Sequence, residues 1–187
     1  LDRFNIEYDR VSPVSIIPDH PEDFVKEKLI VYAGQVIERK GIRLACDLFR
    51  NSGLKEKGYS FEVYGLGAIH AELSAEYNEV SWMGRVDNDV IISSLKRAEA
   101  AILLTSYPEG FPRFLFEASL SGCVPIMFDF VGNEYYGQHN SIIIESDISP
   151  EIFRDLVLDN EIGATSIASL ARQALLTKYN KTLNDLY

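Results

Sequence analysis

The stretch Lys28–Phe49, KLIVYAGQVIERKGIRLACDLF, sets the architecture of this chain. Its first part, Lys28–Ala33, is almost wholly apolar, as expected of a parallel strand covered on both faces. A polar loop follows from Gly34 to Gly41. Apolar residues then recur at helical spacing: Ile42, Ala45, Cys46 and Phe49. The stretch therefore predicts a strand, a loop and an amphipathic helix, which is the repeating unit of an α/β protein.

Further short apolar segments continue this pattern along the chain. They are Phe61–Tyr64, Val80–Met83, Ala100–Thr105, Val124–Phe128 and Ser141–Ile144. Stretches with helical spacing separate them, and the chain is predicted to be helical from Ile148 onward. We therefore expect an α/β fold, a Rossmann-like, doubly wound parallel sheet of about six strands with a helical C-terminal tail.

Length and charge exclude several classes of protein. The 187 residues are enough for about one domain. Lys and Arg number 18 and Asp and Glu 28, so the net charge of −10 argues against nucleic acid as the main partner. Cys46 and Cys123 are too few for a disulfide framework and indicate a reducing compartment. No apolar run approaches the ~18 residues of a transmembrane helix, and no signal peptide is visible. The chain opens on Leu1 rather than Met, so we expect a piece of a longer protein. We also expect that protein to be cytoplasmic.

Glycines mark one edge of the predicted sheet. The residues Gly34, Gly65, Gly67, Gly84 and Gly110 all fall near the carboxyl end of a predicted strand. In an open parallel sheet these ends share one edge, where ligands bind. The alternative is that each glycine only provides a turn with positive φ.

The segment Thr105–Gly122, TSYPEGFPRFLFEASLSG, carries the candidate chemistry. Glu109 lies in the loop after a predicted strand, and Pro112 suits the first position of the following helix. That helix is apolar nearly all round, so it is predicted to be buried with Glu117 in its middle. A buried carboxylate needs a partner, and Arg113, four residues earlier, is the structural alternative to a functional role. The helix start also directs backbone N–H groups into the crevice, where they favour phosphate.

Basic residues gather at the same edge. Arg39, Lys40 and Arg43 follow the first predicted strand, and Arg85 follows the third. In a chain this acidic they are candidates for binding an anion, and the alternative is a solvated helix start.

Cofactor motifs are weak in this sequence. The run GLGAIH, Gly65–His70, follows a strand, but His70 stands where a dinucleotide site needs a small residue. The histidines show no metal-ligand spacing: His20, His70 and His139. We therefore expect neither a dinucleotide nor a metal, and no cofactor.

Residues 28–145 resemble the C-terminal domain of a family 4 (group 1) retaining glycosyltransferase, one half of the GT-B fold. The segments that carry the resemblance are VYAGQVIERKGI, FEVYGLGAIHAEL, VSWMGRVDNDVIISSLKRAEAAILLTSYPEGFPRFLFEASLSGCVPI and DFVGNEYYGQHNSIIIE. The most specific is EGFPRFLFEA, Glu109–Ala118, in which seven residues separate the two glutamates. The resemblance implies that residues 1–27 arrive from an N-terminal domain outside this sequence. Residues 28–187 would then bind the donor, a nucleotide sugar.

The resemblance also implies roles for individual residues. Glu109 would bind hydroxyls of the donor sugar and Lys40 the donor phosphate, and these two are the candidate catalytic residues. Glu117 would bind the ribose of the nucleotide. The full set of implied donor-binding residues is Gly34, Gln35, Arg39, Gly65, Gly67, Arg85, Val86, Gly110, Phe111 and Glu117. The backbone of Gly110 and Phe111 would face the diphosphate or sugar, and residues 65–67 and 84–86 would border the base. No metal is implied.

One residue departs from the family pattern. Gln35 stands where the family usually has arginine, and glutamine cannot make a charged, bidentate contact with phosphate. Arg39 or Arg113 could substitute. The expected function is sugar transfer from a UDP- or GDP-sugar to a glycan or lipid-linked acceptor in polysaccharide or glycoconjugate assembly. The acceptor, and any peripheral contact with a membrane, would involve the other domain. Two alternatives stay open, a non-catalytic nucleotide-sugar-binding homologue or partner subunit and a nucleotide-sugar epimerase.

Overall fold

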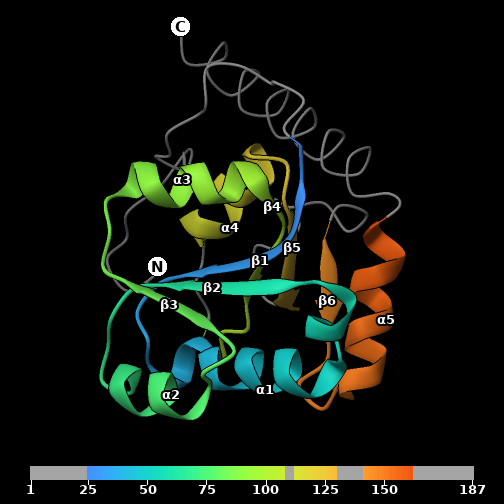
Figure 1. The fold of residues 1–187 in the computed structure, drawn as a ribbon, viewed down its shortest axis with the longest axis horizontal. Coiled ribbons are helices and arrows are strands. Elements are labelled where there is room, and N and C mark those ends of the chain that lie inside the picture. Colours follow the sequence, from blue (N-terminus) through green and yellow to red (C-terminus); the bar gives the residue numbers. More distant parts are fainter. Residues whose placement is uncertain (1–24, 108–111, 130–140, 162–187) are drawn as a thin grey trace, which may run out of the picture.

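The structure, a computed structural model, describes residues 25–107, 112–129 and 141–161 (Figure 1). Its core is a six-stranded sheet in the order β3-β2-β1-β4-β5-β6, and every neighbouring pair is parallel. The strands are β1 (Glu27–Ala33), β2 (Ser60–Tyr64), β3 (Ser81–Gly84), β4 (Ala98–Leu103), β5 (Val124–Phe128) and β6 (Ile142–Ile144). The predicted doubly wound α/β sheet is confirmed.

Helices cover both faces of the sheet (Figure 1). They are α1 (Ile42–Ser52), α2 (His70–Glu76), α3 (Asn88–Arg97), α4 (Arg113–Leu120) and α5 (Pro150–Glu161), with short 3-10 turns η2 (Glu38–Lys40) and η3 (Lys55–Lys57). Helices α3 and α4 lie on one face, and α1, α2 and α5 lie on the other. No helix in the described part of the chain is both long and apolar enough to cross a membrane.

Successive side chains of β1 point to opposite faces of the sheet and belong to two separate hydrophobic clusters. Ile30 and Tyr32 belong to the cluster that contains the buried residues of α1, whereas Leu29 and Val31 pack with Leu95 of α3. Each of these β1 side chains is at most 2% exposed, because a central parallel strand is covered on both sides. The apolar stripe predicted for α1 is buried in full: Ile42, Ala45, Cys46 and Phe49.

The boundaries of β4 differ from the prediction. The sequence indicated a strand over Ala100–Thr105, but β4 begins at Ala98, which pairs with Glu27 of β1. The register of β1 with β4 is irregular between Glu27 and Ile30, and no apolar pattern signals such an irregularity. The predicted features within 1–24, 108–111, 130–140 and 162–187 lie outside the described residues.

Candidate functional site

The centre of the sheet contains the point at which the chain reverses its winding. Strands β1 and β4 are neighbours, although β2 and β3 lie between them in the sequence. The chain leaves β1 for α1 on one face and leaves β4 for α4 on the other (Figure 1). Loops that diverge in this way open a crevice at the carboxyl ends of the two strands, where α/β proteins bind ligands.

Backbone contacts join the loops after β1 and β4. The carbonyl of Arg39 accepts hydrogen bonds from the Ser106 N–H at 3.1 Å and from the Thr105 hydroxyl at 3.3 Å. Gly41, with φ of 68°, permits this approach, since a Cβ there would lie 1.8 Å from the carbonyl oxygen of Leu104. The two loops therefore form one unit at the centre of the edge.

The loop after β2 packs against the loop after β1. The Gly34 N–H donates to the carbonyl of Tyr64 at 3.0 Å. Gly65, at φ of 128°, is equally confined, because a Cβ there would lie 1.9 Å from the Gly34 carbonyl oxygen. Its own N–H donates to the carbonyl of Gly84 at 2.7 Å. The glycines of the predicted edge thus lie together as expected, and Gly67 lies in the same loop, while Gly110 is outside the described residues.

The predicted phosphate-binding residue lies at the junction of the β1 and β4 loops. Lys40 ends η2 and directly follows the Arg39 carbonyl that binds the β4 loop. Gln35 is exposed at the start of the same loop, and its carbonyl accepts a hydrogen bond of 2.7 Å from the Tyr32 hydroxyl. The Tyr32 ring in turn lies 6.5 Å from the ring of Phe114 on α4. The start of α4 is therefore near the residues that follow β1.

Glu117 is buried in α4, as the sequence predicted. Glu117 is 8% exposed, and every residue of α4 from Leu115 to Leu120 is buried. Arg113, the candidate structural partner, is exposed, and no ion pair joins it to Glu117. The local pairing expected from their four-residue spacing is therefore not formed between these two described residues.

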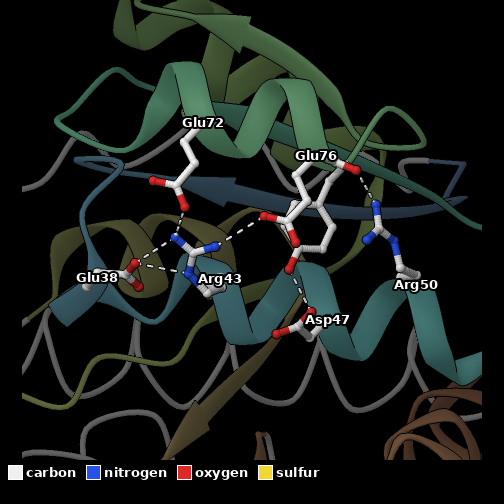
Figure 2. Close-up of polar contacts among 7 residues, drawn as sticks. Glu38, Arg43, Asp47, Arg50, Glu72 and Glu76 are labelled. Atoms are coloured by element: carbon white, nitrogen blue, oxygen red, sulfur yellow. Dashed lines mark hydrogen bonds and ion pairs between the residues drawn. The ribbon is translucent and has the colours of Figure 1, made fainter.

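Arg43 has a structural environment, which favours the alternative interpretation for this residue (Figure 2). Its guanidinium binds Glu38 at 2.7 Å, Glu72 at 2.6 Å and Glu76 at 3.2 Å. Hydrogen bonds to Glu38 and then to Glu72 raise the pKa of Arg43 above its usual value. Since three carboxylates surround this cation, it is a poor binder of phosphate. Through Glu38 it instead ties the turn that contains Lys40 to α2.

A second group of contacts fixes the far end of α2 (Figure 2). Arg50 of α1 binds Glu79 at 2.6 Å and lies 4.1 Å from the centre of the Tyr77 ring. The Tyr77 hydroxyl donates to Asp47 at 2.6 Å. Burial, and then this hydrogen bond, raise the pKa of Tyr77. These contacts hold α2 on α1 and make the glycine loop before α2 part of a rigid frame.

The remaining predicted residues divide into two groups. Arg85 is exposed after β3, and Val86 packs partly against the α3 side of the core. Glu109, Gly110 and Phe111 lie outside the described residues. Sequence reasoning missed Tyr107, which follows β4 and contacts Arg39. The only available signal was an aromatic residue in a loop at the candidate edge.

Metal ligands do not gather in the described residues. No group of three or more His, Cys, Asp or Glu side chains that could hold a metal ion occurs within 25–107, 112–129 and 141–161. The chemistry available at the described part of the site is therefore that of backbone N–H groups, cations, a buried carboxylate and an aromatic ring.

The fold and the site define a Rossmann-like domain with a ligand crevice at its topological switch point. Residues 16–162 match the family model of the glycosyl transferases group 1. Since the match covers most of the chain, this protein belongs to that family. A search of curated protein sequences found no significant match.

Solved structures with the same fold are glycosyltransferases at low sequence identity. A mutant of S. aureus TarM, in complex with fondaparinux, alpha-GlcNAc-glycerol and UDP, is 21% identical with a TM-score of 0.78, over 95% of this chain and 38% of its own. The pneumococcal O-GlcNAc transferase GtfA, in complex with UDP and GlcNAc, is 20% identical with a TM-score of 0.59, over 86% and 36%. Anabaena HepE, in complex with UDP-glucose, is 15% identical with a TM-score of 0.65, over 84% and 48%.

These comparisons confirm that the fold is one half of a GT-B glycosyltransferase. This chain spans less than half the length of each of the three structures.

Proposed function

We propose that this chain is the donor-binding half of a retaining glycosyltransferase that uses a UDP-sugar. The observation that carries the proposal is the junction at Arg39, where the loop after β1 binds the loop after β4. Lys40 directly follows Arg39, whose carbonyl accepts the hydrogen bond from the Ser106 N–H. Family membership gives the reaction class, and the UDP or UDP-glucose in TarM, GtfA and HepE favours UDP over GDP.

In the proposed reaction, an acceptor hydroxyl attacks the anomeric carbon of the donor sugar from the face that the diphosphate leaves. The bond from that carbon to the phosphate oxygen breaks, and its electron pair departs with UDP. The leaving phosphate oxygen accepts the proton of the acceptor hydroxyl as the new glycosidic bond forms. Lys40 stabilises the charge that grows on the diphosphate, an effect that a fixed cation supplies at low reorganisation cost. We propose that Glu109 orients the sugar hydroxyls.

Glu117 is proposed to hold the nucleotide rather than to react. A buried carboxylate accepts strong hydrogen bonds from ribose hydroxyls, because little water is present to compete for its oxygens. In a longer protein, the glycan or lipid-linked acceptor would bind to a second domain across the crevice.

Gln35 favours a second candidate, a non-catalytic nucleotide-sugar-binding homologue. Its neutral side chain is exposed at the start of the loop after β1. A longer protein that contains both domains distinguishes the two when it is incubated with UDP-sugar and no acceptor. Slow release of free sugar supports the transferase, and no release over hours supports the binding homologue. A new epimer in the NMR spectrum of the sugar would instead indicate an epimerase.

Thermal unfolding of the chain with nucleotides tests donor binding. UDP at about a hundred times its Kd should add ~2.7 kcal/mol of stability, which raises Tm by roughly 5–10 °C. Glu117→Ala should remove this rise. Glu56→Ala, an exposed glutamate of η3 at the opposite edge of the sheet, is the matched control and should keep it. No rise with UDP or GDP at millimolar concentration would contradict the proposal.

A further inference from the structure

Arg39 and Tyr107 face each other across the junction of the β1 and β4 loops. The Arg39 guanidinium carbon lies 5.3 Å from the centre of the Tyr107 ring. We propose that Tyr107 is a positioning residue that holds Arg39 as a second cation for the donor diphosphate. This inference rests on the proposed function and adds to it a residue and a specific role.

Hydrogen bonds fix the backbone of Tyr107 to the residues before it. The Tyr107 N–H donates to the hydroxyl of Thr105 at 3.2 Å, and Thr105 is only 3% exposed. The same hydroxyl and the Ser106 N–H both donate to the Arg39 carbonyl. Backbone and side-chain contacts thus tie Arg39 to the β4 loop at two points, which reduces the entropy that its side chain loses when a ligand binds.

The contact with Tyr107 leaves the Arg39 side chain accessible to a ligand. A guanidinium contacts a ring through its flat face, whereas its N–H donors lie in its own plane. Arg39 and Tyr107 are both exposed, the tyrosine by 58%. Because Arg39 is exposed, its N–H donors remain able to bind two phosphate oxygens while it contacts the ring.

Arg43 and Arg85, two other arginines near this edge, are less suited to that role. Arg43 is surrounded by Glu38, Glu72 and Glu76. Arg85 follows β3, which is separated from β1 by β2. By contrast, no carboxylate of the described residues forms an ion pair with Arg39. In a chain of net charge −10, a cation at the switch point that no carboxylate of residues 25–107, 112–129 and 141–161 neutralises is a favourable place for a diphosphate.

Calorimetric titration with UDP tests the pair. Arg39→Gln should weaken UDP binding about tenfold, the effect of losing charge-assisted hydrogen bonds. Tyr107→Leu should weaken it about threefold, whereas Tyr107→Phe, which keeps the ring, should bind as the unchanged chain does. In the Arg39→Gln background, Tyr107→Leu should have no further effect. Lys57→Gln removes an exposed charge from η3 at the opposite edge and is the control for net charge.

Two further readouts separate a charge effect from a change in folding. UDP affinity should fall more steeply with salt in the unchanged chain than in Arg39→Gln. Uridine, which lacks phosphate, should bind both equally. Equal UDP affinity with and without Arg39, or a Tyr107→Leu loss that is the same in both backgrounds, would overturn this inference alone. Failure of the unchanged chain to bind UDP would overturn the proposed function, and this inference with it.

Discussion

The backbone N–H of Ser106 donates a hydrogen bond of 3.1 Å to the carbonyl of Arg39. Ser106 lies in the loop after β4, and Arg39 directly precedes Lys40. The two residues are 67 positions apart in the sequence, and this hydrogen bond joins their loops. The proposed donor site depends on this junction, and so do the predictions that concern it.

The first prediction concerns the glycine that permits the junction. Gly41 and Gly58 both follow a 3-10 turn with positive φ, of 68° and 89°. A Cβ at Gly58 would make only an ordinary van der Waals contact, 3.9 Å from the Lys28 side chain, so Gly58→Ala should cost about 1 kcal/mol for its backbone conformation. Gly41→Ala adds a clash with Leu104 and should cost about 3 kcal/mol or more. Urea denaturation measures both, and equal losses would show that the loops are not confined at Gly41.

The second prediction separates the ribose from the rest of the nucleotide. Glu117→Gln keeps the volume of this buried side chain and removes its charge. UDP affinity should fall about tenfold, since a hydrogen bond to a charged group contributes ~1.5–3 kcal/mol. A UDP analogue without ribose hydroxyls should bind the variant and the unchanged chain alike in calorimetry. A loss of the same size for that analogue would place Glu117 elsewhere in the site.

The third prediction is a dependence of stability on pH. The hydrogen bond from Arg50 lowers the pKa of Glu79 below its usual 4.5. A carboxyl whose pKa is lowered by folding stabilises the fold at pH values above 4.5, and this contribution declines as the pH falls through the lowered pKa. Glu79→Gln should therefore lower Tm more at pH 7 than at pH 3. In Glu56→Gln, the exposed control, Tm should match the unchanged chain at both pH values, and a constant Tm difference for Glu79→Gln would contradict the assignment.

The fourth prediction concerns the two thiols. Burial raises the pKa of Cys46 to about 12 and that of Cys123 to about 11. The Cys123 thiol also donates to the carbonyl of Leu95 at 2.9 Å. Because the thiolate is the reactive form, neither cysteine should react with a disulfide reagent at pH 8 in the folded chain. Both should react in denaturant, and rapid reaction of one thiol before unfolding would show that its site is open.

Much of this fold could be predicted from local sequence. A central parallel strand such as β1 is apolar on both faces, so Lys28–Ala33 stands out without knowledge of its neighbours. The stripe of α1 and the burial of Glu117 follow equally from spacing. The glycine edge could be predicted because parallel strands all end on the same side.

The contacts of the charged residues could not be predicted in the same way. Arg43 pairs with Glu72 and Glu76, 29 and 33 residues away, and only the packing of α2 on α1 brings them together. Arg113 and Glu117 have the spacing of a helical ion pair, yet one side chain is exposed and the other is inside the fold. The ring of Tyr107 under Arg39 likewise depends on how two loops meet.

NMR mapping of UDP on the isotopically labelled chain tests the central claim most directly. If the β1 and β4 loops together form the donor site, UDP should shift the amide signals of residues 34–41 and 104–107. Smaller shifts are expected at residues 65–67, and none at η3 on the opposite edge. Shifts confined to η3 and its neighbours, or no shifts at millimolar UDP, would contradict the account.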